Sequence, residues 1–207
     1  MDSVQHIVDS LNYAIQQLSL EPRAHDDLKN VIGLGMREAI AAIYPEQIDD
    51  AFATQFVEAY RQHFFADDAP QSMFSGAYET LEQLQSQNYM LAVATGKSRH
   101  GLDRALADTG LHDMFIESRC ADETRSKPDP LMLEEILQTL EIKPEHAIMI
   151  GDTEYDLEMA RSAGVHPVGV SYGVHDRQRL QKHHPLQILD AIQDLPDWLS
   201  SHRSTKN

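Results

Sequence analysis

The 207-residue sequence has little cysteine and little positive charge. Its single cysteine, Cys120, excludes an internal disulfide and fits a reducing compartment, so we expect a cytoplasmic protein. Seventeen Lys and Arg stand against 33 Asp and Glu, a formal charge of −16. Such an acidic chain is repelled by polyanions, which argues against binding to nucleic acid or to anionic membranes.

Long apolar runs are also missing. No basic segment followed by an apolar run opens the chain, so the sequence predicts no signal peptide. No stretch approaches the length of a membrane span, and we expect no membrane partner. Hydrophobic residues make up 42% and charged residues 24%, which is ordinary for a globular chain.

The first third of the chain is predicted to be helical. Apolar residues recur at three- and four-residue spacings over 4–18, and a longer helix is predicted over 48–64. Two shorter helices, "DDLKNVI" and "MREAIAAIY", flank Gly33 and Gly35. This pair of glycines either breaks a helix or presents a loop to a ligand. The polar segment "ADDAPQSMFSG" reads as a link, so residues 4–70 are predicted to form a helical domain.

Residues 71–207 have a different pattern, in which short apolar strands are predicted to alternate with amphipathic helices. Strands are predicted at 90–95, 115–120, 147–151 and 167–172, a further short strand or turn near 185–189, and a helix over 189–200. The intervening helices are predicted at 77–87, 99–109, 129–140 and 154–163. This alternation indicates an α/β fold, a doubly wound, mostly parallel sheet covered on both faces.

Polar residues gather where the predicted strands end, which is where open α/β sheets bind ligands. Thr95 and Gly96 follow one strand and offer a hydroxyl and free N–H groups at a helix start. Lys127 precedes a helix that Pro128 and Pro130 introduce. The alternatives to a binding role are an ordinary strand-to-helix turn at Thr95 and a solvated surface position for Lys127. We read Lys97 as a surface residue and Cys120 as filler at a strand end.

Two acids follow the strand "AIMIG". Asp152 ends the strand, and Asp156 lies four residues on, roughly on the same side of a helix, while Glu154 faces away. Paired carboxylates of open geometry suit Mg²⁺, which keeps waters and shares phosphate oxygens. The alternative is that Asp152 and Thr153 only cap the helix. His183 and His184 read as a solvated loop rather than a metal site.

The order of these features resembles the haloacid dehalogenase (HAD) superfamily of phosphohydrolases, in particular its phosphoglycolate-phosphatase-like branch. "FSGAYETLEQLQSQNYMLAVATGKS", "SKPDPLMLEEIL" and "IMIGDTEYDLEMARSAG" are similar to the second, third and fourth motifs of that superfamily. The resemblance implies a Rossmann-type core with a helical cap and an Mg²⁺-dependent phosphatase acting on a small phosphorylated metabolite, of which 2-phosphoglycolate is the candidate. It further implies a monomer or a weak homodimer.

The resemblance also implies roles for individual residues. An aspartate attacks phosphorus to give an aspartyl-phosphate, which water hydrolyses. Thr95, with Gly96, holds the phosphoryl oxygens, Lys127 neutralises charge, and Asp152 and Asp156 hold or orient Mg²⁺. A phosphomutase or a dehalogenase shares the same fold, although the third and fourth motifs favour phosphoryl chemistry.

The first motif of the superfamily, D-x-D-G-T-L, is absent, and "MDSVQHIVDS" resumes the pattern just after it. The nucleophile and the strand that carries it are therefore missing. Four buried aliphatic side chains of such a strand would contribute about 6–12 kcal/mol, comparable with the net stability of a domain, about 5–15 kcal/mol. We expect that the natural protein begins upstream of Met1. The alternative is a short, nucleophile-less protein that binds a ligand or a partner.

Overall fold

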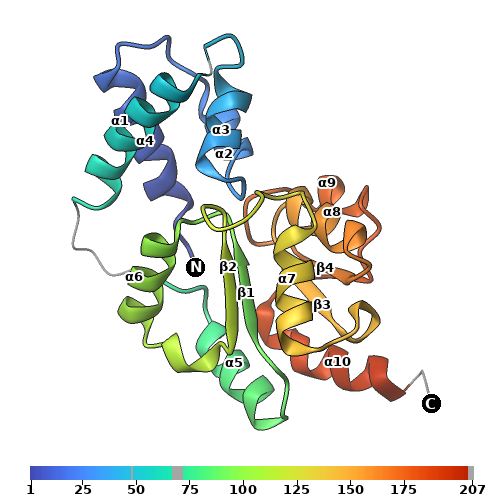
Figure 1. Ribbon diagram of the computed structural model, residues 1–207. Helices are drawn as coiled ribbons and strands as arrows, with labels where there is room; N and C mark the ends of the chain where they lie inside the picture. The colour runs from blue at the N-terminus through green and yellow to red at the C-terminus, as the bar shows by residue number, and fades with distance from the viewer. Residues whose placement is uncertain (48, 67–71, 205–207) are drawn as a thin grey trace.

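The computed structural model describes residues 1–47, 49–66 and 72–204. Two groups of elements share the molecule, with α1–α4 above the strands and their covering helices in Figure 1. The sequence-predicted division between residues 70 and 71 lies outside the described residues. No helix in the described part of the chain is long and apolar enough to cross a membrane.

The upper group, which we call the helical module, consists of α1 (Val4–Gln17), α2 (His25–Asn30), α3 (Met36–Ile43) and α4 (Asp50–Phe64). Its apolar stripes meet in one continuous cluster, in which Val8, Ile40 and Phe56 have no exposed surface. The Asp49 side chain caps α4 by accepting from the N–H of Phe52. The periodicity of the sequence thus translates directly into a packed helical core.

The lower group, which we call the α/β module, carries five parallel strands. They are β1 (Ala92–Thr95), β2 (Glu117–Cys120), β3 (Ile148–Gly151), β4 (His166–Val170) and β5 (Gln187–Leu189). Their helices are α5 (Ala77–Ser86), α6 (Arg99–Thr109), α7 (Leu131–Leu140), α8 (Glu154–Ser162), α9 (Arg177–Gln181) and α10 (Leu195–Ser204). Short 3₁₀ turns lie at His112–Met114, Pro144–His146 and Ile192–Asp194. The α/β class predicted from the sequence is confirmed.

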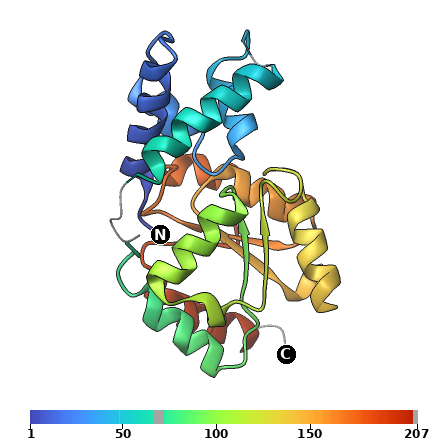
Figure 2. The same ribbon diagram turned by 60° about the vertical axis from the view of Figure 1, so that its left-hand side comes forward.

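The strands form two sheets rather than one. β1 pairs with β2, and separately β3 pairs with β4 and β4 with β5, all in parallel. Helices cover both faces (Figure 2). β4 is bonded on both sides and almost entirely buried, whereas β1 and β3 are only half-buried over most of their length. The strands that read as the most apolar in the sequence are therefore not the most buried ones.

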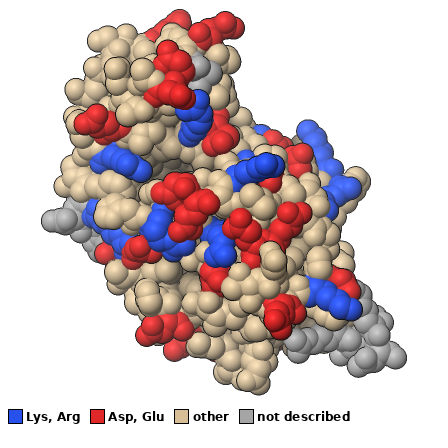
Figure 3. Space-filling model, viewed as in Figure 1, with Lys and Arg blue, Asp and Glu red and all other residues tan. Residues whose placement is uncertain are grey.

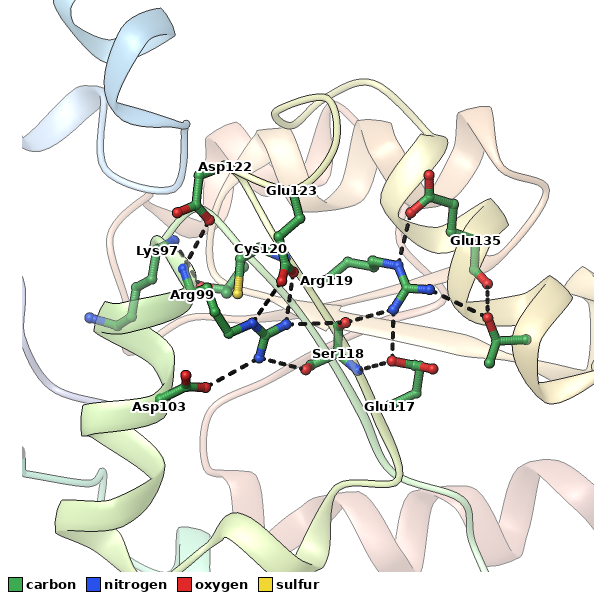
Figure 4. A network of polar contacts seen from close by, with 12 residues as sticks. Lys97, Arg99, Asp103, Glu117, Ser118, Arg119, Cys120, Asp122, Glu123 and Glu135 are labelled. Carbon is green, nitrogen blue, oxygen red and sulfur yellow. Dashed lines mark hydrogen bonds and ion pairs between the residues drawn. The ribbon is translucent and has the colours of Figure 1, made fainter. Parts of the chain in front are cut away.

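The outer strand β2 carries a network of charged side chains, drawn in Figure 4. Arg99 makes a two-pronged contact with Glu123 at 2.7 and 2.8 Å, and Arg119 bonds both Glu117 and Glu135. Such charges along an edge strand oppose pairing with another chain. Cys120, at the end of β2, is fully buried, and burial raises the pKa of its thiol to about 12, which fits filler better than a nucleophile.

Candidate functional site

A single cavity of about 740 Å³ lies between the helical module and the carboxyl ends of β1 and β3. Thr95, Gly96, Lys127, Asp152 and Asp156, the candidate site residues of the sequence, all line it. They come from three segments that are distant in the sequence, each following a strand, as expected for a parallel sheet. The volume is that of a small-molecule site.

The loop after β1 is shaped by Thr95 and Gly96. The Thr95 hydroxyl accepts from the N–H of Lys97 at 3.1 Å, which holds the turn into α6. A Cβ on Gly96 would lie 2.6 Å from the carbonyl oxygens of Gly33 and Leu34. Gly96 is therefore required for the helical module to approach the strand end.

Lys127 and Asp156 form a buried ion pair. The Lys127 Nζ donates to Asp156 Oδ1 at 2.7 Å, and the two residues are only 6% and 3% exposed. The other oxygen of Asp156 accepts from the N–H and the hydroxyl of Thr153. Thr153 in turn accepts from the N–H of Asp156, so the two complete a capping box at the start of α8.

The capping box settles which acid caps the helix. Asp156 and Thr153 cap α8, whereas Asp152 lies one residue before the cap. Both oxygens of Asp156 are bonded to protein groups, which makes it a residue that positions its neighbours. The sequence predicted that Asp156 holds or orients a metal ion, and the contacts of Asp156 suit the orienting role.

Asp152 is the acid with the more unusual surroundings. Its Oδ2 accepts from the N–H of Val174 at 2.9 Å, and a Cβ on Gly173 would collide with its side chain. Burial raises the pKa of the Asp152 carboxyl, and the nearby Asp156 carboxylate raises it further. Two carboxylates facing one buried ammonium leave negative charge that a bound cation would balance.

The donor set fits Mg²⁺ better than a metal that requires an all-protein cage. No group of three or more His, Cys, Asp or Glu side chains able to hold a metal occurs within the described ranges. Mg²⁺ commonly takes one or two carboxylates and completes its shell with waters and substrate phosphate. Asp152, oriented beside Asp156, is the residue that would hold it.

Lys97 is not the solvated surface residue that the sequence suggested. It lines the cavity, its Nζ lies 5.4 Å from the centre of the Phe64 ring, and burial lowers the pKa of its ammonium group. Figure 4 shows its side chain pointing away from the charge network of β2. The sequence missed it because its burial depends on the helical module above.

The two modules contact each other at several places that the sequence did not reveal, among them Gly35, Asn30 and Phe65. The N–H of Gly35 donates to Ser126 Oγ at 2.6 Å, and Gly33 has a φ of +107° that favours glycine. At the end of α2, the carbonyl oxygen of Asn30 accepts from the Tyr155 hydroxyl at 2.9 Å. The Gly33–Gly35 loop therefore faces the cavity as well as separating two helices.

Other predicted side chains lie away from the cavity. Glu154 faces away from it, as expected, and pairs with Arg179. The Nε2 of His183 lies 3.5 Å from Glu154, in the turn that follows α9. On the face drawn in Figure 3, acidic and basic side chains are interspersed.

Comparison with known proteins places this chain in a family. The family described as haloacid dehalogenase-like hydrolase matches residues 1–170. The pyrophosphatase PpaX of Anoxybacillus flavithermus is 28% identical over 194 residues, 91% of this chain and 86% of that protein. The PpaX of Oceanobacillus iheyensis is 30% identical over 72% of this chain and 71% of that protein.

Solved structures show the same fold. A hydrolase from Pseudomonas syringae superposes with a TM-score of 0.88 at 23% identity, over 97% of this chain and 93% of that chain. A predicted phosphoglycolate phosphatase from Haemophilus somnus gives 0.82 at 22% identity, over 96% and 92%. The family match spans most of the sequence and includes Thr95, Lys127, Asp152 and Asp156, and so this chain belongs to the haloacid dehalogenase-like hydrolases.

Proposed function

We propose that the cavity binds the phosphoryl group of a small phosphorylated metabolite together with Mg²⁺, and that it serves phosphate-ester or phosphoanhydride hydrolysis. One observation carries the proposal: a hydroxyl, a buried ammonium and two carboxylates, from three separate loops, line one cavity under the helical module. Phosphoryl transfer requires mainly such positioning and charge stabilisation.

Each residue has a task in this proposal. Thr95 and the N–H groups that follow it bind phosphoryl oxygens at the start of α6, where backbone N–H groups favour anions. Lys127, held by Asp156, supplies a fixed positive charge next to the phosphate. Asp152 holds Mg²⁺, which when bound neutralises charge on the transferring phosphoryl group. The helical module closes the cavity and limits the size of the leaving group.

The substrate classes to test first come from the relatives. Proteins similar to this chain are named pyrophosphatases, and one of similar fold is titled a predicted phosphoglycolate phosphatase. Both names describe small molecules with a second anionic group beside the phosphate. Lys97 also lines the cavity, with its ammonium group over the Phe64 ring, which brings a second positive charge to the same cavity.

A second candidate function is binding without catalysis. The aspartate that attacks phosphorus in the superfamily belongs to the D-x-D-G-T-L motif, which this sequence does not contain. Asp156, the acid opposite Lys127, is bonded at both oxygens and is unsuited to attack. On this alternative the chain retains phosphate and Mg²⁺ without turning over substrate.

Binding and hydrolysis can be measured separately. The melting temperature of the chain is recorded with inorganic phosphate, with MgCl₂ and with both, and release of phosphate from pyrophosphate and 2-phosphoglycolate is assayed in parallel. We expect phosphate and MgCl₂ together to stabilise the protein by more than the sum of each alone. Hydrolysis in addition would support the enzyme, and binding without hydrolysis would support the second candidate.

The matched variants are Asp152→Asn and Asp113→Asn. The amide oxygen of the first can still accept from Val174, so the fold is retained while the negative charge is lost. Asp113 is a fully exposed acid that does not line the cavity, and it serves as the control. The proposal fails if Asp152→Asn responds to MgCl₂ as strongly as the control does.

A further inference from the structure

One residue of the helical module is contacted by three side chains of the α/β module. Asn30, the last residue of α2, presents its carbonyl oxygen to the hydroxyl of Tyr155 at 2.9 Å and to Nε2 of His175 at 3.3 Å. The side-chain oxygen of Asn30 accepts from the guanidinium of Arg179. A carbonyl at the end of a helix has no partner within that helix, and here two donors occupy both of its lone pairs. Asn30 is therefore bound to the α/β module through both of its oxygen atoms.

The three donors are themselves held around the start of α8. Arg179 makes a two-pronged contact with the carboxylate of Glu154, the first residue of α8. The rings of Tyr155 and His175 meet edge to face with their centres 5.4 Å apart, and His175 is only 4% exposed. The contacts of Asn30 thus lead to side chains that are packed and bonded.

The hydrogen bonds of His175 fix which of its ring nitrogens carries the proton. Nδ1 lies 3.0 Å from the backbone nitrogen of Glu154, and an N–H group can only donate, so Nδ1 is the acceptor. The neutral ring then carries its proton on Nε2, the atom that faces the carbonyl oxygen of Asn30. His175 therefore connects the first N–H of α8 with the end of α2 in the helical module.

The backbone on either side of this connection holds Asp152. The N–H of Val174 donates to Asp152 Oδ2 at 2.9 Å, and the N–H of His175 donates to the backbone oxygen of Asp152 at 3.0 Å. A Cβ on Gly173 would lie 2.2 Å from both Cβ and Oδ2 of Asp152, so the two segments are in close contact. The backbone of Val174 thus sets the direction of Oδ2, and the neighbouring ring of His175 fixes that backbone.

The connecting residues can act on a ligand only through Asp152. Asp152 and Val174 line the cavity, whereas Asn30, Tyr155 and His175 do not. A substitution at one of these three therefore removes no direct contact with a bound phosphate or metal ion. An effect of such a substitution on metal binding would report how Asp152 is oriented.

We propose that His175 is a positioning residue, which ties the orientation of Asp152 to the contact between the two modules. With α2 in place, the carbonyl of Asn30 holds the His175 ring, and the ring holds the backbone of Val174 against Asp152. Without that contact, the bond from Val174 to Asp152 weakens. The consequence for Mg²⁺ rests on the proposed function: the ion binds more tightly while α2 is in place, because the residue that holds it keeps one orientation.

Two substitutions at His175 separate its two contacts. In His175→Asn, the amide oxygen takes the place of Nδ1 and can still accept from the N–H of Glu154, but the side chain is too short to reach Asn30. In His175→Gln, the longer amide can still donate to Asn30, but the contact with Glu154 is lost. If the ring only caps α8, the glutamine variant is the more impaired. Our proposal predicts the opposite order.

Tyr155→Phe provides a milder variant that retains the fold. It removes the second donor to Asn30 and keeps an aromatic ring against His175. The matched control is Tyr78→Phe, because Tyr78 is an exposed tyrosine of α5 outside the cavity. The pair therefore tests the contact of α2 without any change at His175.

The first measurement uses the unliganded chain and follows hydrogen exchange of the Val174 amide by NMR. We expect exchange about fivefold faster in His175→Asn, the effect of about one hydrogen bond, and a smaller acceleration in Tyr155→Phe. His175→Gln and Tyr78→Phe should exchange as the natural chain does. Equal exchange at Val174 in the two His175 variants, or faster exchange in His175→Gln, would overturn the proposal.

The second measurement titrates the chain with MnCl₂ in the presence of inorganic phosphate and counts free Mn²⁺ by its paramagnetic resonance signal. Mn²⁺ takes the same carboxylate, carbonyl and water ligands as Mg²⁺. We expect about tenfold weaker binding in His175→Asn and the affinity of the natural chain in His175→Gln.

The outcomes of this titration separate the two proposals. Equal Mn²⁺ affinity in His175→Asn and the natural chain would overturn the positioning role and leave the proposed function intact. A natural chain that binds no Mn²⁺ would contradict the proposed function instead. In that case the exchange of the Val174 amide decides on the positioning role by itself.

Discussion

The two modules of this protein differ in how they bury their apolar residues. The helical module buries its apolar residues in one continuous cluster, in which Ile40 and Phe56 are fully inaccessible. The α/β module distributes its buried residues over four clusters on two sheets, and a cavity separates β1 from β3. Helices satisfy their backbone groups internally, whereas a strand depends on its neighbours. The comparison indicates that the α/β module is the less stable part.

The largest effect should come from breaking the buried ion pair in the weaker module. Asp156→Ala removes the partner of Lys127 and half of the capping box of α8. An uncompensated buried ammonium costs about 3–5 kcal/mol in the free energy of unfolding, measured by urea denaturation. Hydrogen exchange should accelerate in α8 and β3 more than in α1 and α4. Equal acceleration in both modules would show that they unfold as one unit.

A matched pair of truncations compares a fully packed side chain of the helical module with a cavity-lining side chain of the α/β module. Ile40→Ala, in the helical module, should cost about 2–5 kcal/mol because its side chain is fully packed. Ile150→Ala, in β3, should cost only about 1 kcal/mol, because that side chain already borders the cavity and is half-exposed. Both are read from urea midpoints. A reversed order would contradict the contrast in packing between the two modules.

The contact between the modules is tested at Ser126. Ser126→Ala leaves the buried N–H of Gly35 without its acceptor, which should cost about 1–3 kcal/mol. The Ser126→Thr variant retains the hydroxyl and is the control for the loss of the hydrogen bond. If the modules are coupled at this loop, exchange at Gly33–Gly35 accelerates in the alanine variant alone. Unchanged exchange there would indicate that the other contacts between the modules, such as those of Asn30 and Phe65, hold this loop in place.

The smallest effect belongs to the charged edge of β2. The two-pronged contact with Arg99 lowers the pKa of Glu123 to about 2, so this pair stabilises the fold above the unfolded pKa near 4.5 and its contribution fades as pH falls toward 2. Both side chains are 34% exposed, and water screens the pair. Glu123→Gln should therefore cost about 0.5–1 kcal/mol at pH 7 and almost nothing near pH 2.5. A constant difference across this range would contradict the assigned pKa.

The order and type of the elements could be read from the sequence because hydrophobic periodicity reports which faces are buried. The helix expected over 4–18 is α1, and the strands expected at 90–95 and 147–151 contain β1 and β3. The helix expected at 189–200 instead begins as a 3₁₀ turn at Ile192, and α10 extends to Ser204. Ends of elements depend on caps and neighbours more than on periodicity.

The convergence of Thr95, Lys127, Asp152 and Asp156 was also predictable, because parallel strands bring their carboxyl ends to one edge. Their individual contacts were not. The capping box of Asp156 with Thr153 depends on a local rotamer, and the burial of Lys97 depends on a helix 33 residues earlier. The apolar residues of β1 and β3 predict that these strands are buried. They do not reveal that one edge of each strand is not paired with another strand.

The most direct test of the open sheet is site-resolved hydrogen exchange of the unliganded chain by NMR. We predict that the amides of Ala92–Thr95 and Ile148–Gly151 that are not bonded to a neighbouring strand exchange at least about 100-fold faster than the amides of Val168 and Val170 in β4. The amides of α1 and α4 should be protected at least as well as β4. Protection of β1 and β3 equal to that of β4 would contradict the division of the strands into two sheets.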